Sequence, residues 1–185
     1  MQDAHRRQRG FTLVELVVTL AIVAVLATIA LPAFGKLIGR TRAQVARSDL
    51  EYSLNHARLA AVSRGLHVVA CPSSDFDDCA ATTRWHSGWL LFADVDHDGH
   101  RGADEPVIAT NQARDAGVGI LATVGRLRVD YRPDGSASGT NVTLTVCDRA
   151  AGAQDASTIV ISPSGRVRHG QATPEAAAAC IAAAK

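Results

Sequence analysis

An apolar stretch near the N-terminus constrains this chain more than any other feature. Residues 11–31 are apolar apart from Glu15 and three threonines, whereas residues 1–10 are polar and basic. As a helix rising about 1.5 Å per residue, this stretch reaches about 30 Å, the thickness of the hydrocarbon core of a bilayer. We therefore expect a single membrane-spanning helix, with the basic N-terminus in the cytoplasm and the rest of the chain on the other side.

Two residues distinguish this stretch from an ordinary signal peptide. A secretory signal has its small-residue cleavage site after a shorter apolar core, but here the small residue, Gly10, precedes the stretch. A carboxylate within an apolar span is costly and usually has a designated partner. Cleavage after Gly10 would create an amino terminus on Phe11, about one helical turn from Glu15. That amine, from the same or a neighbouring chain, could neutralise Glu15; the alternative is a plain anchor with a chance glutamate.

The run GFTLVE at residues 10–15 resembles the class III prepilin signal of type IV pilins and type II secretion pseudopilins. The resemblance implies cleavage after Gly10 by prepilin peptidase, N-methylation of Phe11 and a role for Glu15 in subunit recruitment. Pro32 stands where this family often has a helix-kinking proline. The resemblance also implies an inner-membrane protein with one span and a periplasmic head, which joins other major or minor pilins in a pilus or pseudopilus filament.

Downstream of Pro32, the pattern changes from an amphipathic helix to short strands. Small apolar residues recur every three or four positions in residues 32–64 and form one stripe. The stripe consists of Ala43, Ala46, Leu50, Leu54, Ala57 and Ala61. The helix should end at Arg64, because Gly65 is a favourable C-terminal cap. The candidate strands are 66–71, 88–93, 106–110, 118–124, 127–131, 141–147 and 158–162. Residues 174–185 are alanine-rich and predict a short helix.

These elements predict an α+β fold of the type IV pilin kind, in which one long helix packs on a mostly antiparallel β-sheet head. The expected segments are a leader (1–10), a transmembrane assembly helix (11–31), an amphipathic helix (32–64) and a β-rich periplasmic head (65–185).

The four cysteines indicate disulfides and not a metal site. None forms a Cys-x-x-Cys pair, which argues against zinc. Four cysteines allow three connectivities; proximity favours Cys71–Cys79 and leaves Cys147–Cys180 to hold the C-terminal tail. Both pairs require an oxidising compartment. The segment from Cys71 to Cys79, with the run GWLLFAD at 88–94, is similar to the GspH/FimT branch of the pilin superfamily.

Charge and motifs restrict the function. Residues 1–10 carry three arginines and Asp3, so their removal changes the net charge from +1 to 1 − 2 = −1. Nucleic-acid binding therefore has to come from a local patch. Neither a Gly-x-Ser-x-Gly elbow nor a phosphate-binding Gly-x-x-x-x-Gly-Lys loop occurs in the sequence, and we expect no enzymatic activity.

The run GRVR at 165–168 is the candidate DNA-binding motif. If it enters a strand, Arg166 and Arg168 project from one face about 7 Å apart and can contact successive phosphates, while Val167 packs inward. In FimT-like minor pilins, such a motif is associated with DNA binding during natural transformation. The alternative is a solvated strand edge on which arginine prevents aggregation. Support could come from Arg126, Arg128, Arg132 and Arg149.

The acidic run from Asp94 has the spacing of an EF-hand calcium loop. Asp94, Asp96 and Asp98 stand at positions 1, 3 and 5, and Glu105 stands at position 12. A strand precedes the run in place of a helix, and Arg101 occupies a position that is usually apolar. Two interpretations therefore remain for these four residues: a calcium-binding loop, or an acidic turn whose aspartates accept hydrogen bonds from their own backbone.

The leading interpretation is a FimT-like minor pilin that assembles into a pilus and binds double-stranded DNA without sequence preference. The first alternative is a structural pseudopilin of type II secretion or a minor pilin that only primes assembly. The second is a calcium-stabilised adhesive module at the filament tip.

Overall fold

A computed structural model describes residues 11–139 and 141–184. The chain divides into two compact units, Met1–Gly35 and Lys36–Lys185. Helix α1, Leu13–Arg64, contributes residues to both units.

The first unit contains the apolar part of α1. Within the described residues, α1 is the one helix long and apolar enough to cross a membrane, with a mean hydropathy of 2.6 in its most apolar window and no buried side chain there. The hydroxyls of Thr19 and Thr28 donate to the carbonyls of Leu16 and Val25, at 2.8 and 2.7 Å. These bonds satisfy both hydroxyls inside the helix, as a hydrocarbon environment requires.

In the second unit, the remainder of α1 presents one buried stripe to the head. All six residues of the predicted stripe, from Ala43 to Ala61, are buried, and Leu50 and Leu54 are fully so. The helix ends at Arg64, and Gly65 follows with a φ of +65°. The amide of Leu66 then donates to the carbonyl of Ala61 at 3.3 Å, which is a Schellman-type cap. The predicted C-terminus of the helix is confirmed.

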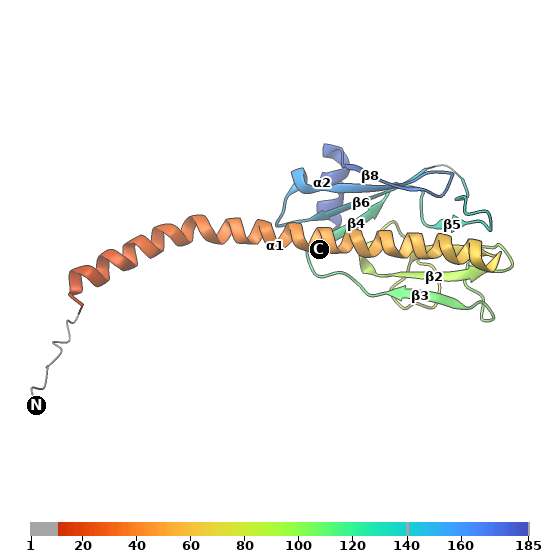
Figure 1. Ribbon diagram of the computed structural model, residues 1–185, viewed down its shortest axis with the longest axis horizontal. Helices are drawn as coiled ribbons and strands as arrows, with labels where there is room; N and C mark the ends of the chain where they lie inside the picture. The colour runs from red at the N-terminus through yellow and green to blue at the C-terminus, as the bar shows by residue number, and fades with distance from the viewer. Residues whose placement is uncertain (1–10, 140, 185) are drawn as a thin grey trace, which may run out of the picture. The chain divides into compact units, whose positions relative to one another are not determined.

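Two four-stranded antiparallel sheets complete the head. Sheet A has the order β3-β2-β1-β5, and sheet B has the order β4-β6-β7-β8. Figure 1 shows β2 and β3 on one side of α1 and β6 and β8 on the other. The strands are β1 His67–Pro72, β2 Trp89–Asp94, β3 Val107–Asn111, β4 Val118–Ala122, β5 Val129–Tyr131, β6 Val142–Asp148, β7 Ser157–Ile161 and β8 Val167–Gln171.

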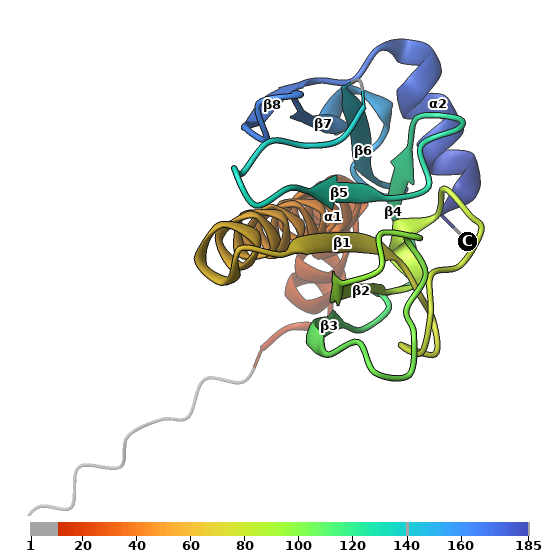
Figure 2. The same ribbon diagram turned by 90° about the vertical axis from the view of Figure 1, so that its right-hand side faces the viewer.

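One main core joins the α1 stripe to both sheets. Trp85, Trp89, Tyr131 and Ile159 are among its fully buried members. The C-terminal helix α2, Pro174–Ala183, lies against β4 and β6 (Figure 2). Its contact forms a separate small cluster of Cys147, Ala156, Ala177, Cys180 and Ala184. The head is therefore α+β and antiparallel, as the sequence predicts, but its strands form two sheets.

The head contains the two disulfides that sequence proximity favours. Cys71–Cys79 closes the loop after β1, and Cys147–Cys180 joins β6 to α2. Gly119 on β4 is required for this second junction, because a Cβ there would lie 2.8 Å from the Cys147 sulfur and 2.9 Å from the Cys180 carbonyl oxygen.

Two strands are shorter than predicted. β4 ends at Ala122; the amide of Thr123 still donates to the Thr143 carbonyl at 2.9 Å, and the chain then turns at Gly125, whose φ is +79°. β5 begins at Val129, two residues later than expected, because Val129 is the first residue of this segment that pairs with β1, opposite Ala70.

Candidate functional site

The expected processing site lies at the start of α1. Gly10 is outside the described residues, while Phe11 and Glu15 are both exposed. The amide of Glu15 donates to the Thr12 hydroxyl at 3.2 Å, so Thr12 caps the helix. Sequence reasoning missed this cap, although Thr-x-x-Glu before an apolar run is its signature. A carboxylate in the first turn also interacts favourably with the helix dipole.

The strand after the Gly-Arg-x-Arg run forms an edge of sheet B. β8 pairs with β7 alone, with Val167 opposite Ile161 and Arg168 opposite Val160. Val167 packs against the main core as predicted. Because side chains alternate along a strand, Arg168 points to the outer face of sheet B. Arg166 precedes β8 and is exposed, so strand alternation does not fix its direction.

The side chains of Arg166 and Arg168 have no intramolecular partner within residues 11–139 and 141–184. No ion pair or hydrogen bond joins the Arg166 or Arg168 side chain to these residues. His169, by contrast, faces α1, where its Nε2 lies 3.1 Å from a Glu51 carboxylate oxygen.

The turn before Arg166 is held by a second turn and by α1. Gly165 has a φ of +72°, and a Cβ there would overlap the carbonyl oxygen of Gly135. Arg58 on α1 donates to the Gly135 carbonyl at 2.8 Å and to the Ser164 carbonyl at 3.4 Å. Gly165, the first residue of the Gly-Arg-x-Arg run, thus allows the two turns to pack closely. Arg58, which the motif search did not single out, positions both turns.

The four supporting arginines do not share one surface. Arg132 begins the turn that packs beside Gly165, which makes it a neighbour of the motif. Arg126 follows β4, the edge of sheet B opposite β8, and lines a surface hollow together with Arg128. Arg149 follows β6 and lies at the opposite end of that sheet. Arg128 donates to the carbonyls of Gly99 at 3.0 Å and Asp98 at 3.5 Å. Arg126, Arg128 and Arg149 are therefore set apart from the motif.

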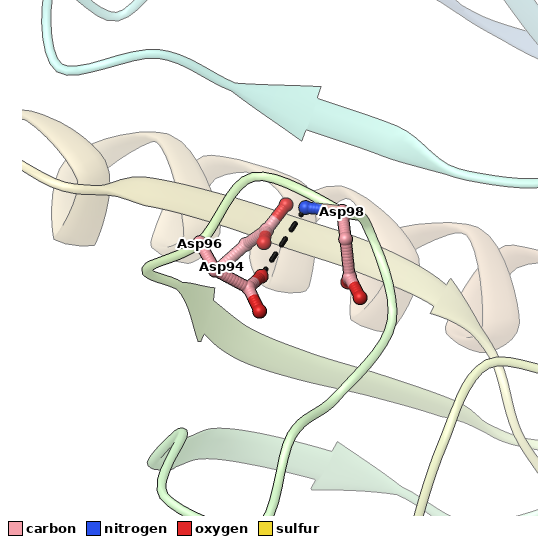
Figure 3. Close-up of side chains that lie close together, drawn as sticks. All are labelled: Asp94, Asp96 and Asp98. Carbon is pink, nitrogen blue, oxygen red and sulfur yellow. Dashed lines mark hydrogen bonds between the residues drawn. The ribbon is translucent and has the colours of Figure 1, made fainter.

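The predicted acidic loop connects β2 to β3. Asp94 ends β2, and its carboxylate, with those of Asp96 and Asp98, places ligand atoms within 4.8 Å of one another. Figure 3 shows the three side chains on this loop, with the amide of Asp98 bonded to Asp96 at 3.2 Å. The Asp98 carboxylate accepts from the amide of His100 at 2.6 Å. Three oxygen ligands of the predicted set are thus brought together.

Glu105 is not the fourth member of this cluster. Its two carboxylate oxygens accept from the amides of Val95 at 2.5 Å and Gly102 at 2.9 Å. The side chain is 6% exposed and closes the base of the loop from inside. In an EF-hand the residue at position 12 binds the ion, but here it binds the backbone.

Comparison with known protein families identifies the chain. A family model described as "Type II transport protein GspH" matches residues 46–165, which is more than half of the chain. The chain belongs to the GspH family. A second model, described as a prokaryotic N-terminal methylation motif, matches residues 5–31 of this GspH-family protein. That range includes the Gly10–Phe11 junction and most of the apolar stretch.

Relatives and solved structures are pilins or pseudopilins. A "Fimbrial protein" of Pseudomonas aeruginosa is 30% identical over 122 residues, covering 65% of this chain and 71% of its own length. The "Type IV major pilin protein PilE1" of Neisseria gonorrhoeae is 38% identical over 76 residues, 36% of this chain and 45% of its own.

Two solved structures share the fold. The minor pilin FimU of Pseudomonas aeruginosa has a TM-score of 0.56 at 19% identity, over 74% of this chain and 92% of FimU. The minor pseudopilin EpsH of the Vibrio cholerae type 2 secretion system has a TM-score of 0.50 at 11% identity, over 70% and 97%. These likenesses establish the pilin fold for the GspH-family chain.

Proposed function

We propose that this GspH-family protein is a minor pilin of a type IV pilus, FimT-like in role, that binds double-stranded DNA for uptake in natural transformation. The observation that carries the proposal is the exposed pair Arg166 and Arg168 at a sheet edge, without an intramolecular partner among the described residues. Unoccupied guanidiniums beside a polar surface are suited to phosphate, which they bind through two parallel hydrogen bonds.

The surroundings of the pair support a phosphate-binding surface. Arg132 lies beside the motif, and the outer row that starts at Arg168 continues through Val160 and Thr143 to Thr123. This row carries no acidic residue, so it does not repel a polyanion. Two carboxylates lie near the row: Glu175 of α2, which lines the same hollow as Thr123 and Thr143, and Asp134 in the turn after Arg132. Hydrogen bonds from the Ser136 hydroxyl and amide hold the pKa of the Asp134 carboxyl below the ordinary value. Binding through phosphates carries no base information and is therefore sequence-tolerant.

Assembly proceeds through the N-terminal helix in this proposal. Prepilin peptidase cleaves after Gly10, Phe11 becomes N-methylated, and Glu15 accepts the amine of a neighbouring pilin in the inner membrane. The supporting observations are the match to the methylation motif and the exposure of Phe11 and Glu15 on an apolar helix. The head then reaches the filament surface, where DNA is captured.

The test is a salt titration of DNA affinity on the head, residues 36–185, which contain the whole core and both disulfides. In an Arg166→Gln, Arg168→Gln variant, two lost phosphate contacts lower the slope of log K against log salt by about 2. Between about 50 and 200 mM salt, the advantage of the wild type should then shrink about tenfold. Arg149→Gln, at the opposite end of sheet B, is the matched control and should leave the slope unchanged within error.

Equal affinity of wild type and double variant at every salt concentration would refute the DNA-binding role. The chain would then be a structural subunit, either a pseudopilin of type II secretion or a minor pilin that primes assembly.

A further inference from the structure

The strongest unassigned feature of the head is the carboxylate that ends β2. Asp94 is only 2% exposed, and its Oδ1 is buried without a hydrogen-bond partner among the described residues. A buried carboxylate oxygen without a partner is costly, and native structures rarely leave one unsatisfied. Because Asp94 also contributes a ligand atom to the cluster with Asp96 and Asp98, the unsatisfied oxygen belongs to a side chain that reaches this cluster.

The environment of Asp94 is unfavourable to its negative charge. Burial raises the pKa of its carboxyl, and the nearby charges of Glu105 and Asp130 raise it further. The amides of Gly99 and His97 oppose these effects and do not cancel them. Asp94, Asp96 and Asp98 bring three carboxylates to one place, and Glu105 and Asp130 lie nearby.

No cationic side chain of residues 11–139 and 141–184 neutralises the cluster. None forms an ion pair with Asp94, Asp96 or Asp98. The basic groups closest along the chain and on neighbouring strands have other partners. Arg128 donates to the loop carbonyls, and the His97 ring packs on that of His67, with centroids 4.1 Å apart.

The remaining basic groups of this region are also engaged. His67 lies 3.0 Å from Asp130. His100 lies 3.2 Å from a carboxylate oxygen of Asp78. Arg101 pairs with Asp77 at 3.0 Å and donates to the Glu105 carbonyl. Arg128 thus adds a positive charge beside the loop, but none of these basic groups pairs with a carboxylate of the cluster, which leaves the three aspartates open to a cation from solution.

We propose that Asp94, Asp96 and Asp98 bind one calcium ion. Carboxylates are the ligands of hard cations, and calcium accepts six to eight oxygens in flexible geometry, so backbone carbonyls and water can complete its shell. Magnesium demands a near-ideal octahedron, and zinc prefers nitrogen and sulfur ligands. Glu105 is a positioning residue, because both of its oxygens hold the backbone at the base of the loop. The site differs in this respect from an EF-hand, and it does not depend on DNA binding.

The experiment uses the full chain in detergent micelles, stripped of metal and melted in EDTA, in CaCl2 or in MgCl2. When calcium exceeds its Kd about 100-fold, the Tm of the wild type should rise by about 5–10 °C. A hundredfold excess corresponds to about 1 mM CaCl2 for a site with the affinity of a sensor EF-hand, and to about 10 mM for a site at the tight end of the extracellular range. Absence of a calcium shift would overturn the proposal, and an equal shift with MgCl2 would overturn the choice of calcium.

Three variants test the ligand assignment. Asp96→Asn removes an exposed ligand, so it should leave the Tm in EDTA unchanged and weaken calcium binding more than about tenfold in calorimetric titration. Asp104→Asn, an exposed aspartate of the same loop outside the cluster, should keep the full calcium shift. Asp94→Asn should raise the Tm in EDTA, because it removes an unsatisfied buried charge, and abolish the shift. A full calcium response in Asp96→Asn, or an equal loss in Asp104→Asn, would overturn the assignment.

Discussion

Removal of the Cys147–Cys180 disulfide should destabilise the head more than removal of Cys71–Cys79. The two bridges join residues 33 and 8 positions apart. The chain-entropy relation then gives about 3.7 kcal/mol of stabilisation for the longer loop and about 2.5 kcal/mol for the shorter one. We therefore expect the double alanine variants to differ by about 1.2 kcal/mol in their free energies of unfolding.

A second effect distinguishes the two bridges. The apolar cluster beneath α2 consists of alanines and the disulfide itself, with Leu121, Ala172 and Ile181 at its margin. Alanine buries little apolar area, so without the bridge α2 should detach at a lower free energy than the head unfolds. The Cys71–Cys79 bridge has no such role, because it closes a loop over the outer face of sheet A.

Two assays measure these effects on the head. Urea unfolding followed by circular dichroism gives the free energies, and a difference of about 1.2 kcal/mol corresponds to about 0.6 M urea in midpoint if m is about 2 kcal/mol/M. Hydrogen exchange reports α2 directly, since its amides should lose protection in the Cys147→Ala, Cys180→Ala variant alone. The reasoning is refuted if the Cys71→Ala, Cys79→Ala variant is the less stable, or if α2 keeps its protection without its bridge.

Three further substitutions test turns of the head. Gly165→Ala should cost about 2–4 kcal/mol in urea unfolding, because it combines a positive φ with overlap on Gly135; Gly125→Ala, with similar φ and open surroundings, should cost only about 1–2 kcal/mol. Burial raises the pKa of Asp78, but amide hydrogen bonds from Arg101 and Cys79 outweigh it and hold the pKa below its ordinary 3.8. A lowered carboxyl pKa stabilises the head above the unfolded value and loses this contribution as pH falls through the folded one. Asp78→Asn should therefore destabilise at pH 7 and flatten the midpoint curve below about pH 4; a curve parallel to wild type would contradict this.

Features written in local sequence could be predicted. The apolar span, the α1 stripe and the end of α1 follow from periodicity and from Gly65, and the structure has them at the expected residues. Most strands lie within two residues of their predicted limits, because each is a short apolar run between turn residues. The spacing of the carboxylates also predicted correctly that Asp94, Asp96 and Asp98 lie together, since the three residues alternate within one short loop.

Features set by long-range pairing could not be predicted. Nothing local indicates that β5 pairs with β1 and not with β4, so the division into two sheets was missed. The same limit explains the arginines. Arg128 does not differ from its basic neighbours in sequence, but it directly precedes β5 and lies beside the acidic loop. Arg149 follows β6 and therefore lies at the opposite end of sheet B. Glu105 matched a ligand position by count, but the fold uses its oxygens for two amides.

The two bonds of Arg58 have a mechanical consequence. An edge strand pulled away from its sheet separates one hydrogen bond at a time, and β8 has a neighbour on one side alone. Arg58 belongs to α1 and holds the carbonyls of Gly135 and Ser164, immediately before the first residues of β8. Tension applied near Arg166 therefore reaches α1 directly through a side chain, and the strand ladder is not the sole path that resists it.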